Sequence, residues 1–327
     1  MIIHRGNGDD TGVRPLAESA LLAAITVLLM FIGAFLPLAG LFVVLAWPVP
    51  VMVVIMRHGV RYGVMAVVVT VLLATMFLGL LQAVFAGVTL VGFIGVAFGV
   101  GLDRNWNAPT LIGAGTVVVT LAFLVAILIS GPLMGVDLLE QMQFMMDESI
   151  ERAADMYLGL GLDPEQVEET VEQMQVTMVY LKMVFPAVFM FSALMYALWT
   201  YLMTRLILPR LGYVVPDLAP FAVWRAPIWL AFVLLAAFVG DIAAPVGESL
   251  VRMFARNVLF ATDMIYRVFG ISLLYYFARR YLRSRWLAGG LCAFLSLNGV
   301  IFLLLPLVGI MDSGFNFRGR FQSRVTR

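Results

Sequence analysis

The longest break in the apolar character of this sequence is an acidic stretch from Val136 to Thr177. Its carboxylates belong to Asp137, Glu140, Asp147, Glu148, Glu151, Asp155, Asp163, Glu165, Glu168, Glu169 and Glu172, and its single base is Arg152. Taking a charged group without a partner out of water costs several kcal/mol, so this stretch must lie in the aqueous phase. Because long apolar runs flank it, it separates an N-terminal set of membrane helices from a C-terminal set.

The composition is typical of a multi-pass membrane protein, since 62% of the residues are hydrophobic and 13% are charged. A formal net charge of +1 argues against a nucleic-acid partner, which requires a basic surface. Cys292 is the single cysteine, which excludes an internal disulfide and a cysteine metal cluster. The composition therefore predicts that the protein lies in a lipid bilayer.

Apolar runs that exceed the length of a bilayer crossing predict an all-α, polytopic transmembrane bundle of about nine spans. The predicted spans are 16–36, 38–56, two within 63–101 that are joined by a turn near 82–87, 109–129, 178–208, 228–245, 257–278 and 286–310. The predicted regions are a polar cytoplasmic N-terminus (1–15), spans one to five (16–135), an acidic extracytoplasmic insertion (136–177), spans six to nine (178–310) and a basic tail (311–327). The insertion is too short to bury a core of its own, so we expect one membrane domain.

The acidic insertion has a helical pattern of its own. Apolar residues recur at helical spacing from Leu138 to Tyr157, with carboxylates between them, which predicts an amphipathic helix at the membrane surface. Gly159 and Gly161 end this helix, and Asp163-Pro164 begins a second one, because aspartate favours the cap position and proline the first turn. The second helix is expected to continue into span six, with a kink at Pro186.

Lysine and arginine decide the orientation, because cytoplasmic loops carry an excess of them. If the insertion is extracytoplasmic, alternation places the N-terminus, the loop with Arg57 and Arg61, the connector 205–225 and the cluster Arg279–Arg285 in the cytoplasm. Only the tail breaks the rule: either its arginines lie outside, or span nine fails to cross. The sequence predicts an inner-membrane protein with a cytoplasmic N-terminus.

Asp263 and Arg267 in span eight are candidates for a solute site. Spaced i, i+4, they can meet on one helix face inside the bilayer, where they either line a pocket or form an ion pair that holds the span in the bundle. Arg256 and Asn257 precede them near the outer boundary, and Asn298 lies within span nine. Arginine matches carboxylates and phosphates, so this group could recognise an anionic or zwitterionic solute. Lipid headgroups, and a helix–helix hydrogen bond from Asn298, are the alternatives.

Other residues are candidates for contacts with proteins. A proline-rich connector, 215–227, which we call the elbow, carries Phe221 and Trp224 and could dock a partner; a tryptophan there is also typical of the membrane interface. Gly95 and Gly99 form a small-xxx-small pair, which indicates either a homo-oligomer face or close packing within the chain. Glu18 near the inner end of span one is either a coupling or protonation site or a boundary residue.

The sequence lacks the motifs of the common enzyme classes. Its histidines are His4 and His58, and neither stands in an HExxH motif or in a paired-ligand setting. No Gly-x-Ser-x-Gly elbow and no Gly-x-x-x-x-Gly-Lys loop is present. We therefore expect no catalytic site, no metal site and no cofactor.

Several short motifs are shared with a known family. They are the opening Leu16–Ile25, Arg210-Leu211-Gly212 followed by Pro220-Phe221, Trp224 and Pro227, and Arg256-Asn257 followed by Gly270-Ile271-Ser272 and Tyr275-Tyr276. In these motifs the chain resembles the YybS-like family of bacterial integral membrane proteins, and the resemblance covers most of the sequence. It implies a multi-pass inner-membrane protein of a family with no assigned activity.

Ala20 and Ala24 carry a second likeness, through their AxxxA spacing in the first span. This spacing resembles the S components of energy-coupling-factor vitamin transporters, in which a helical bundle binds a small solute and an alanine face meets a membrane coupling subunit. The likeness implies that Ala20 and Ala24 would contact such a subunit. The larger number of spans and the acidic insertion depart from that pattern.

Two hypotheses for function follow from these observations. The first is a small-solute-binding or transport-related membrane protein, favoured by broken helices and by buried charge in span eight. The second is a non-transporting membrane scaffold or assembly protein for the cell envelope, favoured by the elbow and the acidic helix. An enclosed polar cavity that reaches Asp263, Arg267 and Asn298 would favour the first hypothesis, and a closed core the second.

Overall fold

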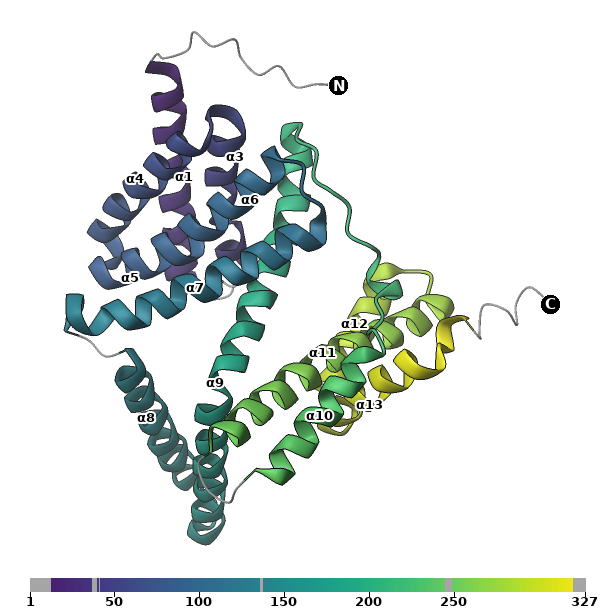
Figure 1. Cartoon of the computed structure of the whole chain (residues 1–327). Coiled ribbons are helices and arrows are strands. Elements are labelled where there is room, and N and C mark those ends of the chain that lie inside the picture. Colours follow the sequence, from purple (N-terminus) through teal and green to yellow (C-terminus); the bar gives the residue numbers. More distant parts are fainter. Residues whose placement is uncertain (1–12, 37–39, 41, 136–137, 245–248, 320–327) are drawn as a thin grey trace. The chain divides into compact units, whose positions relative to one another are not determined.

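The computed structural model describes residues 13–36, 40, 42–135, 138–244 and 249–319, and all regular elements within these residues are helical (Figure 1). The chain forms two compact units. The first comprises Met1–Glu148 and Ser192–Leu218, and the second Ser149–Phe191 and Ala219–Arg327. Two long helices, α8 (Leu138–Gly159) and α9 (Pro164–Ile207), each contribute to both units.

In the first unit, α3 (Val49–His58) packs against α1 (Val13–Phe35), α4 (Val60–Leu78) and α6 (Ile94–Asp103). The other elements of this unit are η1 (Val44–Ala46), α5 (Leu80–Val84), η2 (Phe85–Phe93), α7 (Ala108–Met134) and η3 (Leu208–Leu211). Met52, Phe98 and Tyr201 are fully buried in its core. Burial of these large side chains holds α3, α6 and the C-terminal half of α9 together.

The glycine pair on α6 lies against α3. A Cβ on Gly99 would stand 2.9 Å from the Cβ of Ile55, and a Cβ on Gly95 would stand 3.1 Å from the Cβ of Val51. Small residues let helix backbones approach this closely. The pair therefore serves packing within the chain, which is the second of the two alternatives that the sequence left open.

Two helical spans occupy the region 63–101, as predicted, but the turn between them lies earlier than predicted. It falls at Gly79, whose φ of +81° is a conformation that residues with a Cβ rarely adopt. The chain then continues through η2, which is a π-helix. There the hydroxyl of Tyr196 donates a hydrogen bond to the carbonyl of Leu90 at 3.0 Å. Because this π-helix is continuous with α5 and α6, residues 82–87 are helical and do not form a turn. The predicted turn near 82–87 is therefore wrong.

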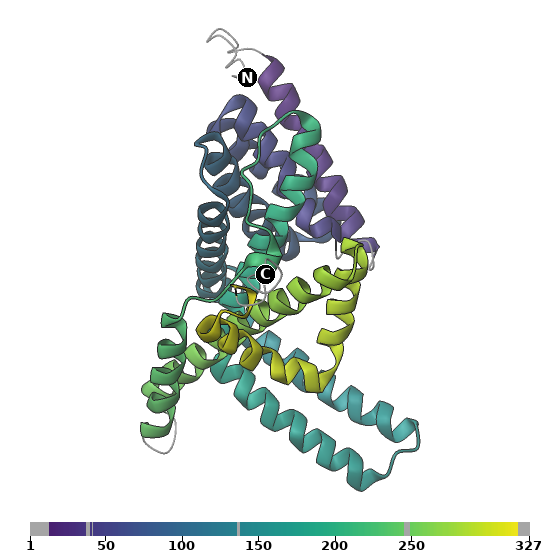
Figure 2. The same ribbon diagram turned by 90° about the vertical axis from the view of Figure 1, so that its right-hand side faces the viewer.

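The second unit contains η4 (Phe221–Val223), α10 (Trp229–Ala243), α11 (Leu250–Tyr281), α12 (Arg285–Leu297) and α13 (Gly299–Phe315). From a turn at Gly161, with φ +82°, α8 and α9 run in opposite directions (Figure 2). Asp163 begins α9 by accepting a hydrogen bond from the Glu165 N–H at 3.0 Å. The helix ends predicted for the acidic insertion are confirmed, while its extracytoplasmic location stays a prediction.

Six helices among the described residues are long and apolar enough to cross a membrane. Val44–His58 and Trp229–Ala243 are shorter apolar helices, and α12 and α13 form one pair that is bent by 108°. The predicted fold class, an all-helical polytopic bundle, is confirmed. The predicted count of nine spans is not confirmed: within the part of the chain that the structure describes, predicted spans two and seven are short helices and predicted span nine is bent at its centre.

The helices α11 and α13 cross in close contact at two glycines. A Cβ on Gly270 would overlap the carbonyl oxygen of Leu305, and a Cβ on Gly309 would overlap that of Tyr266. The backbones therefore approach so closely that only glycine fits at either position. This crossing organises the second unit.

Candidate functional site

A concentration of charge lies where α10 ends and α11 begins. The Nε of Arg256 donates a hydrogen bond to Oδ1 of Asp241 at 3.0 Å, and the Nε of Arg252 lies 4.0 Å from the same oxygen. Ser249 caps α11 by accepting a hydrogen bond from the Arg252 N–H. Two guanidinium groups thus share one carboxylate, while the three side chains stay 19% to 32% exposed. Because the side chains are partly exposed, a ligand can approach the two guanidinium groups from outside.

Asn257 bridges two backbone groups of α9 on either side of Pro186. Its Oδ1 accepts a hydrogen bond from the Ala187 N–H at 2.9 Å, and its Nδ2 donates one to the Met183 carbonyl at 2.9 Å. In a regular helix these two groups would bond to each other, but a proline ring disturbs the preceding turn. The Asn257 amide therefore repairs the interrupted helix, so its side chain is occupied within the protein.

The structure brings the predicted pair Asp263 and Arg267 together, with 2.7 Å between Oδ2 and Nε. Nη1 of Arg267 also donates to the Phe302 carbonyl at 2.6 Å, and the guanidinium lies over the Phe302 ring at 4.1 Å from its centroid. The ion pair is confirmed, and its arginine ties α11 to α13. The role of the pair in a solute site stays a prediction.

Asn298 lies at a break and not inside a continuous helix. Its Oδ1 accepts hydrogen bonds from the N–H groups of Val300 and Ile301 at 3.1 and 3.2 Å, and so caps α13. Gly299 follows it, and an Asn-Gly pair is a common breaker of regular structure. The role of Asn298 in a solute site stays a prediction, but its side-chain oxygen already serves the helix.

The elbow is held against α11 in the second unit. The hydroxyl of Ser272 lies 2.5 Å from the Phe221 carbonyl and 2.9 Å from the Trp224 carbonyl. The indole N–H of Trp224 donates to the Ala219 carbonyl at 2.8 Å, and the ring of Phe221 packs against those of Trp224 and Tyr275. Phe221 and Trp224 are thus used to build the elbow, and their predicted contact with a partner stays a prediction.

Contacts that the sequence analysis did not foresee join the elbow to α13 and to the residues after it. Arg225 donates from Nε to the Asp312 carbonyl at 3.0 Å and from Nη2 to the Ser313 carbonyl at 2.7 Å. Arg318 forms a buried ion pair with Asp312, with 3.1 Å between Nε and Oδ2, and donates to the Ala222 carbonyl. The sequence did contain a sign of these contacts: Asp312 stands at the end of a long apolar run, where a carboxylate needs a partner.

Ala20 and Ala24 lie on the exposed side of α1. The residues of α1 that are buried in the first unit are Pro15, Ser19, Ala23, Thr26 and Met30. The alanine face is therefore not used for packing within this unit. Its contact with a coupling subunit stays a prediction.

Glu18 joins segments of the first unit that are distant in sequence. Its Oε2 lies 2.9 Å from Nε2 of His58 and 3.5 Å from Nη1 of Arg57, and its Oε1 accepts from Nε of Arg14 at 3.2 Å. Arg57 also donates to the hydroxyl of Tyr213 at 2.6 Å. The start of α1, the end of α3 and the residues after η3 therefore meet at one end of the unit, as the alternation of spans predicts.

Replacing Glu18 with glutamine is expected to lower the stability of the first unit by about 1 kcal/mol or less, because the ion pairs are partly exposed. The midpoint of thermal unfolding in detergent measures this loss, which should shrink as salt is added. Glu168→Gln on the exposed side of α9 is the matched control. Equal effects of the two substitutions would contradict a role for Glu18 in joining these segments.

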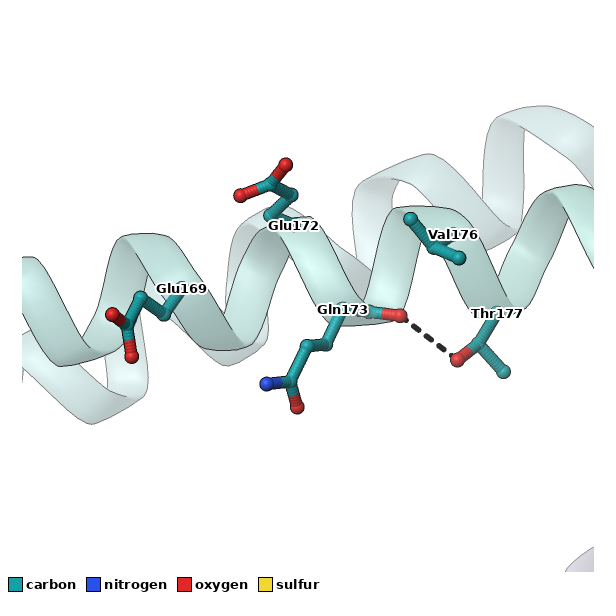
Figure 3. Close-up of a pocket in the computed structure, with 5 residues that line it drawn as sticks. All are labelled: Glu169, Glu172, Gln173, Val176 and Thr177. Atoms are coloured by element: carbon teal, nitrogen blue, oxygen red, sulfur yellow. Dashed lines mark hydrogen bonds between the residues drawn. The ribbon is translucent and has the colours of Figure 1, made fainter.

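The pocket shown in Figure 3 is an open hollow along a single helix. It is lined by Glu169, Glu172, Gln173, Val176 and Thr177, all of them exposed residues of α9. One helix face cannot enclose a solute, so this pocket does not support a binding site. Among the described residues, no group of three or more His, Cys, Asp or Glu side chains is arranged to hold a metal ion.

Comparisons with known proteins address the family of the chain. It is 20% identical to the "Uncharacterized protein YybS" of Bacillus subtilis (strain 168) over 313 residues, which are 94% of this chain and 98% of that protein. No solved structure matches it. The family described as "Predicted membrane protein (DUF2232)" matches residues 24–313. With the several apolar helices of the fold, this match shows that the chain is a membrane protein of the DUF2232 family.

Proposed function

We propose that this membrane protein has a non-enzymatic, transport-related role and binds a small anionic or zwitterionic solute at Arg252 and Arg256. The observation that carries the proposal is the sharing of Asp241 by the two guanidinium groups. Guanidinium groups bind carboxylates and phosphates in a planar, bidentate geometry, so two of them side by side suit an anionic group. Their partial exposure leaves them within reach of a ligand.

The surroundings of the two arginines support this proposal. Nη1 of Arg256 donates a hydrogen bond to the sulfur of Met183 on α9 at 3.2 Å, next to the turn at Pro186 that Asn257 bridges. The arginine group and this part of α9 therefore lie side by side in the second unit. Interrupted helices beside charged side chains are typical of solute sites in transporters. In this proposal Asn257, Asp263 and Arg267 hold the helices around the site.

Native mass spectrometry after gentle purification tests the proposal. We expect an anionic or zwitterionic small molecule to remain bound to the wild-type protein and to be lost from Arg252→Gln and Arg256→Gln. The exposed Arg61→Gln in the first unit is the matched control and should retain it. Retention of phospholipid alone would assign the arginines to headgroups, and an identical set of bound molecules in all four proteins would contradict the proposal.

A scaffold or assembly role is the alternative, and one observation favours it. Ala20 and Ala24 are exposed on α1 and could seat another membrane helix, either of a coupling subunit or of a second copy. Crosslinking from Ala20→Cys in a Cys292→Ala background tests this contact. Under the solute-binding proposal alone no protein adduct is required, whereas a scaffold must give a specific one.

A further inference from the structure

The helices α12 and α13 are each shorter than a typical bilayer crossing. They contain 13 and 17 residues, which at about 1.5 Å per residue gives about 20 and 26 Å, less than the hydrocarbon thickness of about 30 Å. The 108° bend between them prevents the two lengths from adding. Either the pair is a broken span that still crosses, or it is a re-entrant hairpin that returns to the face it entered.

The contacts at the end of α13 distinguish these alternatives. Arg225, in the elbow just before α10, donates to the carbonyls of Asp312 and Ser313 at 3.0 and 2.7 Å. Just beyond α13, Arg318 donates to the Ala222 carbonyl at 2.5 Å and to the hydroxyl of Ser272 at 3.1 Å. The last turn of α13 therefore lies where the chain enters α10.

The same region is close to the end of α11. Ser272 holds the elbow and lies nine residues before Tyr281, the last residue of α11. At about 1.5 Å per residue this separation is about 14 Å along the helix, about half of the hydrocarbon thickness of about 30 Å. The chain thus leaves α11 and returns from α13 toward the same face of the membrane.

The break inside the hairpin is compatible with the bilayer. Irregular backbone at membrane depth requires partners from the protein for its polar groups. Asn298 supplies them to two N–H groups of α13, and the glycine crossing buries α13 against α11. In α12, Trp286, Phe294 and Leu297 are 91%, 72% and 84% exposed, as expected of side chains that face lipid.

The distribution of charge is an independent argument. With a crossing at span nine, the tail arginines Arg318, Arg320, Arg324 and Arg327 are the exception to the positive-inside rule. With a re-entrant hairpin they lie on the same side as Arg279–Arg285. All other lysines and arginines then lie in loops or termini on that side, except Arg152, Lys182, Arg252, Arg256 and Arg267. The tail is therefore no longer an exception to the positive-inside rule.

We propose that α12 and α13 form a re-entrant hairpin that enters and leaves through the face of the elbow, so that the C-terminal tail lies on the same side of the membrane as Arg279–Arg285. The six long helices and the two shorter ones then make an even number of crossings. Both ends of the chain lie on one side. This proposal concerns topology and does not depend on the solute-binding proposal.

Labelling of single cysteines with a membrane-impermeant maleimide tests the hairpin. Cys292 is the one native cysteine and is buried, so Cys292→Ala gives a background in which a cysteine is appended after Arg327. Tyr281→Cys, at a residue 80% exposed, reports the face of the arginine cluster. Leu160→Cys, at a residue 73% exposed, reports the face of the acidic helices.

We expect the appended cysteine and Tyr281→Cys to be labelled from the same side of sealed vesicles, and Leu160→Cys from the other. Labelling of the appended cysteine from the side of Leu160→Cys, or equally from both sides, would overturn the proposal. If the Cys292→Ala background fails to fold, C-terminal fusions of the native chain to a fluorescent protein and to a phosphatase, compared with fusions after Tyr281, give the same comparison.

Discussion

Replacing Gly270 or Gly309 with alanine is expected to destabilise the second unit by about 2–3 kcal/mol, at the upper end of the range for overpacked cores. The added methyl group would overlap the Leu305 carbonyl in one case and the Tyr266 carbonyl in the other. Backbone oxygens cannot move aside as a flexible side chain can, so α11 and α13 must separate. The measurement is the midpoint of thermal or denaturant unfolding in detergent, followed by fluorescence.

Gly289→Ala and Gly290→Ala on α12 are the matched controls, because a Cβ at either position meets nothing within 4 Å. These variants should lie within about 0.5 kcal/mol of the wild type. The double variant Gly270→Ala/Gly309→Ala should lose less than the sum of the single losses, because one separation of the helices relieves both overlaps. Equal stability of the Gly270, Gly289 and Gly309 variants would contradict the close crossing.

Features that depend on neighbours in sequence could be predicted. The ion pair of Asp263 and Arg267 follows from i, i+4 spacing, and the ends of the acidic helices follow from Gly161 and Asp163. The apolar runs likewise predicted an all-helical membrane fold, because the required length and composition are local properties. These predictions agree with the structure.

Features that depend on distant contacts could not be predicted from spacing. The partner of Asn257 lies some seventy residues earlier, on α9, and nothing in the local pattern links the two. The number of spans is not confirmed, because the hydropathy of an apolar run does not show where the helix within it bends or ends. Asn298-Gly299 did carry a local signal for the bend, but the return of Arg318 to Ala222 is visible only in the fold.

Among the candidate site residues, the structure assigns clear tasks to those with side-chain hydrogen bonds. Asn257, Arg267 and Asn298 each bond to backbone groups of the chain, which explains their presence in apolar runs without a solute. Arg252 and Arg256 both approach Asp241, and Arg252 also donates a hydrogen bond to the Ala244 carbonyl. Residue type and position suggested Asn257, Arg267, Asn298 and Arg256 as site residues, and only the geometry shows which of them support the helices.

Loss of the hydrogen bonds from Asn257 to α9 is expected to give the second large loss of stability. Asn257→Leu is expected to cost about 2–4 kcal/mol, because it leaves the Ala187 N–H and the Met183 carbonyl unpaired, and each buried polar group without a partner costs about 1–3 kcal/mol. Ala187 is buried, so water cannot readily replace the lost amide. Thermal unfolding in detergent measures the loss.

Pro186→Ala provides the test of mechanism. Without the proline ring, α9 can restore the hydrogen bond from the Ala187 N–H to the Met183 carbonyl, and the amide of Asn257 is no longer required. We therefore expect Asn257→Leu to cost about 1–2 kcal/mol less in the Pro186→Ala background than in the native chain, a coupling typical of residues in contact. If the cost is the same in both backgrounds, Asn257 does not repair the break at Pro186, and its loss acts only through packing between α9 and α11.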